Sequence, residues 1–434
     1  MSLIQEIARG LENGRAMAAS ASAGAFCCAE HHVFDPSEAG GSAVACGDNL
    51  HYMKWLLDQG YAGRFQTIYI DPPFFSKSKY DAVVSVRDAE NRLCKIRHQA
   101  YDDTFDRSLE SYVTNMTARL LLMKELLSDD GLLWVHLDWH SSHYLKLVMD
   151  ELFGPKNFQN EIIWKYKSGG SGKRHFSRKH DTILIYSKTP RYYLNVPQEK
   201  SYNRGLKPYR FKGVKEYRDE YGWYTMVNMK DVWSIDMVGR TSKERTGYAT
   251  QKPLELMRRI VEASSEPGDL VGDFFCGSGS FLEAAARLGR SYIGCDREEL
   301  AVAAAKKRLN GIRSGYEYHR TEAQAPLTDR CRLEVLRREE LESGKYLYTA
   351  ALTEFRPELD EGHIPIRDRG DAVRILQEDP MKLIDYIMID PGGQDPFSAD
   401  VTVTEDWDCI RFISAGSYTI LIVDVFGKEY LIHG

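Results

Sequence analysis

The chain has 434 residues, of which 43% are hydrophobic, 11% aromatic and 28% charged. This length and composition indicate a globular protein of about two or three domains, and they exclude a disordered, collagenous or coiled-coil chain. No apolar run approaches the roughly 18 residues that a membrane span needs. The sequence shows no basic leader followed by a strong apolar stretch, so we expect no secretory signal. The eight cysteines form no regular framework and no CxxC pair, which favours reduced thiols in a cytoplasmic protein.

Charge is distributed unevenly along the chain, although the net charge is only −6. Residues 155–215 contain fifteen Lys and Arg against three acids, a net of +12, whereas residues 331–434 contain eleven basic and twenty-one acidic residues, a net of −10. A basic run alone often marks a solvated surface. Here tyrosine and phenylalanine side chains interleave with the cations, which favours contact with nucleic acid.

The first third of the chain alternates strand and helix patterns. Residues 1–33 form an N-terminal extension, with a short helix predicted at 3–11 and a stretch of small residues after it. Residues 34–155 are the first part of an α/β domain, with strands predicted at 65–70 and 131–137 and a helix at 113–127. This alternation predicts a parallel sheet covered by helices on both faces.

The alternation stops and then returns further along the chain. Residues 156–249 form a basic segment, rich in Gly and Tyr, that interrupts it. Residues 250–315 resume the pattern, with helices predicted at 253–264, 281–288 and 298–309 and strands at 270–275 and 291–295. Residues 320–434 form an acidic C-terminal domain of unknown role, which ends in a hairpin predicted from strands at 418–425 and 428–433.

The first loop with a chemical signature follows the strand predicted at 65–70 and reads Asp71-Pro72-Pro73-Phe74. Its two prolines remove two amide donors, so the carbonyl groups of this turn stay available as acceptors beside the Asp71 carboxylate. A site with acceptors and no donor suits an exocyclic NH2 group, and Phe74 offers a surface on which a base can stack. Asp and Pro are also ordinary turn residues, so this loop alone is equally compatible with a turn that ends a strand.

The second loop, Asp273-Phe274-Phe275-Cys276-Gly277-Ser278-Gly279-Ser280, joins a predicted strand to the helix at 281–288. Its glycines allow the backbone to approach a ligand at a helix N-terminus. Asp296, at the end of the next strand, is placed to accept hydrogen bonds from both hydroxyls of a ribose. NAD sites share this plan, but the third glycine of GxGxxG is absent, which leaves an NAD-dependent dehydrogenase as a distant alternative.

Together, Asp71-Pro72-Pro73-Phe74 and Phe275-Cys276-Gly277-Ser278-Gly279 resemble the motifs of the amino-group DNA methyltransferases, which use S-adenosyl-L-methionine to methylate N6 of adenine or N4 of cytosine. The order of the motifs, with the Asp-Pro-Pro-Phe loop first, the basic segment second and the glycine loop last, resembles the β class of that family. Within this class the chain is similar to the modification subunits of type III restriction-modification systems and to solitary relatives. The similarity spans about residues 44–312 and includes the stretches 47–49, 130–138, 180–187 and 248–254.

The resemblance implies an overall fold and a function. The fold is the doubly wound, mostly parallel α/β sheet of S-adenosylmethionine-dependent methyltransferases, in permuted motif order, with an inserted target-recognition segment at 156–249 and a small C-terminal α+β domain. The implied activity is site-specific, adenine-specific methylation of a flipped-out base in double-stranded DNA, within a restriction-modification system or by a solitary methylase. A homodimer and a restriction endonuclease partner are compatible with the resemblance.

The resemblance also implies roles for residues of both loops. Asp71 and the Pro72 carbonyl would accept the two amino hydrogens, and Pro73 and Phe74 complete the catalytic loop, with Phe74 stacked on the base. The residues expected to contact the cofactor are Asp48, Lys252, Pro253, Asp273, Phe275, Cys276, Gly277, Ser278, Gly279 and Asp296. Asp296 would bind the ribose, Lys252 and Pro253 would close the methionine end of the site, and Asp48 either contacts the adenine amino group or caps a turn.

Two positions depart from the family pattern. Phe74 replaces a commoner Tyr, which keeps the stacking surface and removes a hydroxyl, and Phe75 stands where many adenine enzymes of this order have Asn. Asp at the head of the motif favours adenine, as the resemblance implies, so N4-cytosine methylation is the main alternative. A non-catalytic nucleotide-binding or DNA-binding relative is a further alternative, against which the intact Asp71, Gly277 and Asp296 argue.

DNA contacts are expected in the basic segment, where residues 169–172 form a glycine-rich loop. The cations expected to neutralise phosphates there are Lys165, Lys167, Lys173, Arg174, Arg178 and Lys179. A second cluster has the residue types of a zinc site, namely His136, Asp138, His140 and His143. This acid-rich strand end occurs in the family without metal, so we expect no metal.

Overall fold

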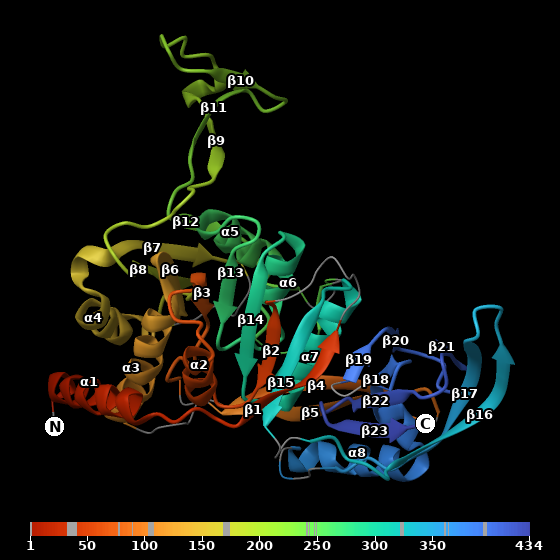
Figure 1. Cartoon of the computed structure of the whole chain (residues 1–434). Coiled ribbons are helices and arrows are strands. Elements are labelled where there is room, and N and C mark those ends of the chain that lie inside the picture. The colour runs from red at the N-terminus through yellow and green to blue at the C-terminus, as the bar shows by residue number, and fades with distance from the viewer. Residues whose placement is uncertain are drawn as a thin grey trace.

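The computed structural model shows a central sheet with helices on both sides (Figure 1). It describes the whole chain apart from residues 1, 33–40, 77–78, 89, 103–107, 168–173, 240–241, 243, 247, 249, 322–324, 360–361, 363 and 394–396. Within the described residues the sheet has eleven strands, in the order β12-β7-β8-β6-β3-β13-β14-β2-β15-β1-β19.

The middle of this sheet, from β6 to β15, is parallel throughout. Antiparallel pairings follow on each side, between β6, β8 and β7 and between β15 and β1. The strands are β12 (Val232–Ser234), β7 (Phe158–Lys165), β8 (His180–Ser187), β6 (Leu127–Leu137), β3 (Phe65–Ile70), β13 (Leu270–Asp273), β14 (Ser291–Asp296), β2 (Ala43–Cys46), β15 (Tyr316–Thr321), β1 (Phe26–His32) and β19 (Phe397–Ala399). The mostly parallel α/β sheet predicted from the sequence is therefore confirmed.

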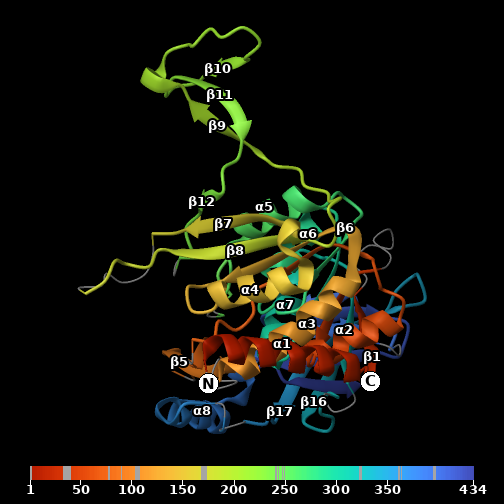
Figure 2. The ribbon, with the colours of Figure 1, turned by 90° about the vertical axis from the view of Figure 1, so that its left-hand side faces the viewer.

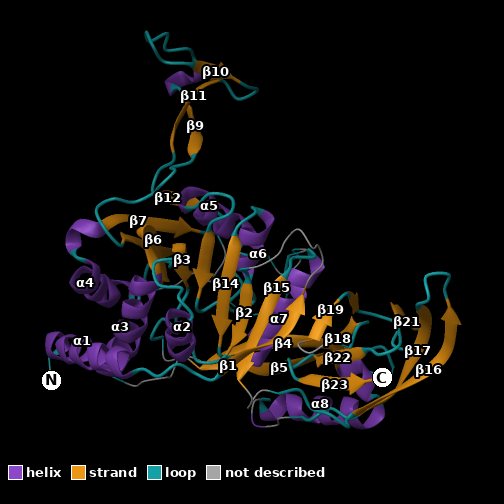
Figure 3. Cartoon of the chain, in the orientation of Figure 1, coloured by secondary structure: helices purple, strands orange, loops and turns teal. Residues whose placement is uncertain are grey.

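Helices cover both faces of the sheet (Figure 3). One face packs against α2 (Asn49–Asp58), α3 (Leu109–Leu126) and α4 (Ser142–Phe153), and the other against α5 (Leu254–Ser264), α6 (Ser280–Arg287) and α7 (Glu299–Gly311). Apolar residues recur on one side of these helices, as at Leu256, Met257, Ile260 and Val261 of α5, and their burial forms the two halves of the core. No described helix is both long and apolar enough to cross a membrane.

The N-terminal helix is longer than the sequence predicts. We expected a helix at 3–11 followed by small residues, whereas α1 extends over Leu3–Ser20. Alanine, which is abundant in 16–19, is the best helix former, and α1 packs on α3. Gly10 and Gly14 permit this close approach, because a Cβ atom at Gly14 would lie 2.4 Å from the Cβ atom of Thr117.

The C-terminal part contains two smaller sheets and one helix. The sheets are formed by β16 (Cys331–Glu340), β17 (Tyr346–Phe355) and β21 (Ile410–Ser414), and by β20 (Val401–Val403), β18 (Ile384–Asp390), β22 (Thr419–Asp424) and β23 (Glu429–His433), with α8 (Ile366–Glu378) beside them. The antiparallel pairing of β22 and β23 confirms the predicted hairpin. This part contacts the rest at several places. β19 pairs with β1, the hairpin of β4 (Lys79–Arg87) and β5 (Leu93–Asp102) contributes to its core, and α7 contacts β18 and β23.

A small antiparallel sheet, which we call the arm (residues 198–228), projects from the body of the molecule (Figure 2). It consists of β9 (Gln198–Tyr202), β10 (Glu216–Arg218) and β11 (Trp223–Asn228). The chain enters and leaves the arm at one place, where the Met229 amide donates to the Pro197 carbonyl at 2.7 Å. The arm lies inside the basic segment, but the sequence did not predict its strands.

Candidate active site

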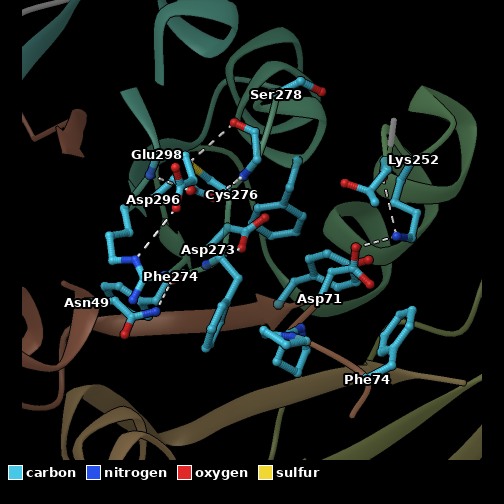
Figure 4. Close-up of a pocket in the computed structure, with 18 of the residues that line it drawn as sticks. Asn49, Asp71, Phe74, Lys252, Asp273, Phe274, Cys276, Ser278, Asp296 and Glu298 are labelled. Atoms are coloured by element: carbon cyan, nitrogen blue, oxygen red, sulfur yellow. Dashed lines mark hydrogen bonds and ion pairs between the residues drawn. The ribbon is translucent and has the colours of Figure 1, made fainter. Parts of the chain in front are cut away.

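The two loops singled out in the sequence lie at the ends of neighbouring strands. β3 and β13 pair in parallel, with Ile68 opposite Gly272, so the chain leaves both strands at the same edge of the sheet. Residues 71–75 follow β3 and residues 274–279 follow β13, and both loops line one pocket that encloses about 1360 Å³, including space open to solvent. Figure 4 shows Asp71 and Phe74 on one side of this pocket and Asp296 and Glu298 on the other.

Asp71 has two carboxylate oxygens in different surroundings. Its Oδ2 atom accepts an ion-paired hydrogen bond from Lys252 Nζ, and its Oδ1 atom is buried with no hydrogen-bond partner among the described residues. The prediction of a site without donors is therefore wrong in one respect, because an ammonium group stands beside the carboxylate. Lys252 lies two residues before α5 and reaches the Asp71 loop. Its expected role at the methionine end of the cofactor stays a prediction.

Phe74 faces a polar wall. Its ring lies 6.2 Å from the ring of His136 at 29°, and Lys252 Nζ lies 5.9 Å from its centroid. The His136 ring is held by two hydrogen bonds, to Tyr69 Oη at 2.9 Å and to Asp181 at 3.2 Å. A flat apolar ring with polar neighbours on one side is suited to holding a nucleobase by stacking.

The residue after Phe74 has an unusual backbone. Phe75 has a φ of +59°, which is rare for a bulky side chain. Its ring stacks on Tyr112 at 5.2 Å, and the Tyr112 hydroxyl donates to the Pro73 carbonyl at 3.0 Å, so α3 fixes the shape of the loop. Asn adopts this left-handed conformation several-fold more readily than Phe, which gives a physical reason for the Asn common at this position in the family.

The glycine loop is tied to the next strand by Asp296. The Gly277 amide donates to Asp296 Oδ2 at 2.9 Å, and the Glu298 amide donates to Oδ1 at 3.1 Å. Gly277 itself has a φ of +50°, in the left-handed region that favours glycine. Asp273 is buried and accepts from the Phe275 amide at 3.0 Å. Burial raises the pKa of both Asp273 and Asp296 above the ordinary range of a carboxyl group.

Most of the predicted cofactor residues line the pocket, and these are Asp48, Lys252, Asp273, Phe275, Cys276, Gly277, Ser278 and Asp296. Pro253 and Gly279 do not, because Pro253 precedes the first turn of α5 and Gly279 packs against α7. Asp48 caps α2 by accepting from the Leu50 amide at 2.8 Å, and it pairs with Arg119 at 3.1 Å. The predicted capping role is therefore present, and Asp48 faces the pocket as well.

Several residues that line the pocket were not predicted, and they are Asn49, Tyr112, Asn115, Arg119, Tyr248, Thr250, Gln251, Arg297 and Glu298. Asn49 donates to the Phe274 carbonyl and accepts from Arg119 Nε at 2.6 Å, which joins α2 and α3 to the glycine loop. The sequence could have indicated Asn49 and Glu298 as pocket residues, because Asn49 adjoins Asp48 and Glu298 follows Asp296 by two residues. Arg119 offered none, because it lies in the middle of a helix.

The cations expected to contact DNA lie around the β7–β8 connection, at the same edge of the sheet as the pocket. Lys165 ends β7, and Arg174 and Arg178 are exposed. The Arg178 guanidinium lies 3.7 Å from the centre of the exposed Trp139 ring, and Lys167 Nζ lies 3.5 Å from Asp236. Lys179 is part-buried and donates to the Lys167 carbonyl. Lys173 and the loop at 169–172 lie outside the described residues.

Three of the four residues considered for zinc, namely His136, Asp138 and His140, contact other side chains. His136 contacts Tyr69 and Asp181, and His140 pairs with Asp138 at 2.6 Å. Among the described residues, the ligand types that gather within 4.8 Å of one another are instead Cys28, Glu317 and His319, none of which lines the pocket.

Comparison with known proteins assigns the chain to a family. Residues 65–307 match the N6/N4 family described as DNA methylase. The chain is 30% identical over 322 residues to the type II methyltransferase M.EcaI of Enterobacter cloacae, covering 60% of this chain and 68% of that protein. It is 29% identical over 289 residues to the type II methyltransferase M1.MboII of Moraxella bovis, covering 61% and 97%.

A solved structure, the cytosine-N4-specific PvuII DNA methyltransferase, aligns with a TM-score of 0.42 and 16% identity over 65% of this chain and 88% of that one. The family match covers more than half of the chain and contains both loops of the pocket. The chain therefore belongs to the N6/N4 DNA methylase family.

Proposed function

We propose that this DNA methylase transfers a methyl group to the exocyclic N6 of an adenine flipped out of double-stranded DNA. A DNA methylase takes its methyl group from S-adenosyl-L-methionine, which is therefore the cofactor. The observation that carries the proposal is the buried, unpartnered Oδ1 atom of Asp71, which stands beside Phe74 in the pocket that the glycine loop also lines. A buried acceptor without a partner is costly, and an amino hydrogen of a base would satisfy it.

The pocket residues fit the cofactor. Asp296 and Glu298 line the pocket and would offer carboxylate acceptors to the ribose hydroxyls, and the acidic residues of the wall would suit a cationic sulfonium. Ser280 Oγ is buried and has no hydrogen-bond partner among the described residues, so a polar donor or acceptor is available at the N-terminus of α6. Gly277 has a φ of +50°, where a side chain would be strained, and it lies against the Tyr248 ring, 3.4 Å from where a Cβ atom would stand.

The residues of the Asp71 loop hold the base and its amino group. A base inside a duplex must be swung out, at a cost of a few kcal/mol, and stacking on Phe74 offsets part of this cost. Asp71 Oδ1 accepts one amino hydrogen and the Pro72 carbonyl accepts the other, so the nitrogen lone pair is directed away from the loop. Lys252 holds Asp71 Oδ2 and thereby fixes which oxygen faces the base.

When bound, S-adenosyl-L-methionine would supply the methyl group, which would leave sulfur as the amino nitrogen takes it, and one amino proton would be released. Asp71 Oδ1 would hold that proton in a hydrogen bond until it passes to water. The main contribution of the site is alignment, since well-oriented reacting groups account for about 7 to 11 kcal/mol of a barrier in favourable cases.

Adenine is proposed as the target because Asp heads the catalytic loop, as it does in adenine enzymes that the chain resembles. The relatives reported above are type II enzymes, so the likeness to type III modification subunits stays a prediction, as do a homodimer, an endonuclease partner and a cytoplasmic location. The roles of Lys165, Lys167, Arg174, Arg178 and Lys179 in holding DNA are part of the same proposal, since their charge borders the pocket edge of the sheet.

The experiment incubates the protein with unmethylated phage DNA and cofactor labelled in its methyl group, followed by analysis of the nucleosides. We expect label in N6-methyldeoxyadenosine; label in N4-methyldeoxycytidine would reassign the base, and label in neither would contradict the function. Asp71→Asn should lower the rate about 100-fold or more, because it replaces one of the two acceptor oxygens with an NH2 donor while Lys252 still binds the remaining oxygen. Cofactor binding by calorimetry should be unchanged in Asp71→Asn, and the exposed Asp129→Asn serves as the matched control.

A further inference from the structure

Three side chains of metal-ligand type meet on one face of the sheet where β1 pairs with β15. They are Cys28 of β1 and Glu317 and His319 of β15, and one ligand atom from each lies within 4.8 Å of the others. The antiparallel register brings them together, because Cys28 stands opposite His319, and Glu317, two residues before His319, points to the same face. This cluster is distinct from the strand end at 136–143, where we expected no metal.

The His319 ring is oriented by a contact on its far side. His319 is only 6% exposed, and its Nδ1 atom is hydrogen-bonded to the hydroxyl of the buried Tyr52 at 2.8 Å. Its Nε2 atom faces Glu317 and lies 2.9 Å from Oε2. Metal-binding histidines usually donate their other ring N–H to a hydrogen-bond acceptor. When Nδ1 donates to Tyr52 Oη, the lone pair of Nε2 points at the cluster.

Aromatic side chains enclose His319 on the side of α2. The Trp55 ring meets the His319 ring edge-on at 5.2 Å, Tyr52 stacks on Trp55 at 5.6 Å, and Phe26 packs on Tyr52 at 4.9 Å. The opposite side of the cluster is open to solvent, because the Glu317 side chain is 44% exposed and Cys28 is only partly buried. The imidazole is therefore held in place, and an ion can reach it from the other two ligands.

The ligand atoms suit Zn²⁺. Sulfur, imidazole nitrogen and carboxylate oxygen are the atoms that Zn²⁺ accepts, at distances of about 2.0 to 2.3 Å. In a tetrahedron, such bond lengths separate neighbouring ligand atoms by about 3.4 to 3.6 Å. In the cluster, His319 Nε2 and Glu317 Oε2 are 2.9 Å apart, and each pair of ligand atoms lies within 4.8 Å. Small side-chain rotations therefore admit the ion. Mg²⁺ and Ca²⁺ do not fit, because both take oxygen ligands.

Binding of the ion requires one proton to leave the cluster. The Cys28 thiol donates to the Glu30 carbonyl at 3.5 Å, and a thiol is a weak donor. Zn²⁺ binds the thiolate, so this proton passes to water. The imidazole stays neutral, because its proton resides on Nδ1 and Nε2 binds the ion. The Glu317 carboxylate exchanges its contact with Nε2 for a bond to the metal.

We propose that Cys28, Glu317 and His319 bind one Zn²⁺ ion, with water in the fourth position. The ion joins β1 to β15, next to the place where β1 also pairs with β19 of the C-terminal part (Figure 1). It therefore fastens the N-terminal strand to the catalytic sheet. The three residues are not among those that line the pocket. The inference does not depend on the proposed function, because metal binding is measured without DNA or S-adenosyl-L-methionine.

The first test uses Co²⁺, which occupies Zn²⁺ sites and absorbs light where Zn²⁺ does not. The untagged full-length protein is kept reduced and anaerobic, freed of metal with a chelator and titrated with Co²⁺. Wild type should bind one equivalent and show a near-ultraviolet charge-transfer band from thiolate to Co²⁺. Zn²⁺ should then abolish the band, because it binds such sites more tightly than Co²⁺ does.

Two cysteine variants place the ion on one face of β1. Cys28→Ser should lose the charge-transfer band, whereas Cys27→Ser should keep it. Cys27 is the matched control, because it is exposed, directly precedes Cys28 and points to the other face of the strand. A wild type without the band, or a Cys28→Ser variant that keeps it, would overturn the site. Loss of the band in both variants would assign the ion to the two adjacent thiols and would overturn it as well.

Two further variants test the histidine and its orientation. His319→Gln should weaken Co²⁺ binding about 10-fold or more, and the exposed His433→Gln should leave it unchanged. Tyr52→Phe should weaken Co²⁺ binding roughly 10- to 100-fold, because Nδ1 loses the partner that directs Nε2 to the ion. Equal Co²⁺ affinity of His319→Gln and wild type would contradict the proposal.

Zn²⁺ should also raise the thermal midpoint, because an ion that binds only the folded chain shifts the unfolding equilibrium by mass action. The shift should grow with Zn²⁺ concentration and be equal in wild type and Cys27→Ser. Cys28→Ser should match wild type without metal and gain no shift from Zn²⁺. Glu317→Gln is the second variant if Cys28→Ser fails to fold, since its side chain is 44% exposed, and it should reduce the shift. A shift that survives both substitutions would overturn the site, whereas a protein that binds Zn²⁺ at Cys28 but methylates no DNA would refute the proposed function alone.

Discussion

At the scale of single residues, the active site depends on how its carboxylates are partnered. Asp71 has one oxygen occupied by Lys252 and one oxygen without a partner among the described residues. The sequence predicted Asp71 and its loop because Asp-Pro-Pro-Phe is a compact local signal. It did not predict the pair with Lys252, because 181 residues separate the two and no local pattern encodes such a contact.

Asp273 should make cofactor affinity depend on pH. Burial raises its pKa, so the carboxyl holds a proton to a higher pH than usual. The cationic cofactor beside Asp273 favours the ionised carboxylate, so cofactor binding should release a proton. Cofactor affinity should therefore rise with pH, up to the pH at which Asp273 of the free protein has lost its proton as well. Calorimetry in buffers of different ionisation enthalpy measures the release. Asp273→Asn should reduce the proton release by the share that Asp273 contributes, and the share of Asp296, whose pKa is also raised by burial, should remain. A wild type whose affinity is flat from pH 5 to about 8 would contradict this account.

At the scale of elements, most helices and strands near the pocket follow from local periodicity. The helix predicted at 253–264 is α5, and the strand at 65–70 is β3 with the same bounds. The arm was not predicted, because β9 and β11 alternate between partly and fully exposed residues and bury no apolar face. Their polar sequence resembles a loop, and only pairing with each other makes them strands.

Gly279 shows how strongly one element boundary is specified. It has a φ of +73°, and a Cβ atom there would lie 2.8 Å from the Cβ atom of Ala305 in α7. Gly279→Ala should therefore destabilise the fold by about 1 to 3 kcal/mol, and should weaken cofactor binding because the glycine loop shifts. Gly370→Ala in α8 is the control, since it meets no atom within 4 Å and should be neutral or slightly stabilising. Denaturant unfolding gives both values, and equal stability of the two variants would refute the steric argument.

At the scale of the whole molecule, the acidic C-terminal part is integrated with the catalytic sheet. Buried Lys306 of α7 pairs with Glu30 of β1 and with Glu429 of β23, each at 2.7 Å. The sequence indicated a separate acidic domain and gave no sign of this contact, because charge composition does not encode which buried groups meet. It also gave no sign that β19 would extend the main sheet beyond β1.

Asp424 should make the stability of the protein fall as pH rises. Burial raises its pKa to about 7, despite hydrogen bonds from the Phe426 and Lys428 amides and the Tyr430 hydroxyl. Between its ordinary value near 4 and about 7, the folded chain holds a proton that the unfolded chain has lost. The contribution of protonated Asp424 to the free energy of unfolding is complete below about pH 4 and is lost as the pH approaches 7. Its upper limit is on the order of 4 kcal/mol.

Thermal midpoints across this pH range test the point. Asp424→Asn should flatten the part of the pH dependence that Asp424 causes, whereas the exposed Asp408→Asn should keep the wild-type profile. If the thermal midpoints of both variants change with pH as those of wild type do, Asp424 is ionised in the folded protein across this pH range, and burial does not control its pKa.

The junction of Pro197 and Met229 has an evolutionary consequence. The arm begins and ends where the Met229 amide donates to the Pro197 carbonyl. The number of residues in the arm can therefore change with little effect on the rest of the fold, because each doubling of the length of such a loop costs only about 0.6 kcal/mol of closure entropy. Grafting, trimming or replacing this appendage leaves the strand ends that hold Asp71 and Asp296 where they are. The surface that the arm presents can therefore change without a change in the residues of the pocket.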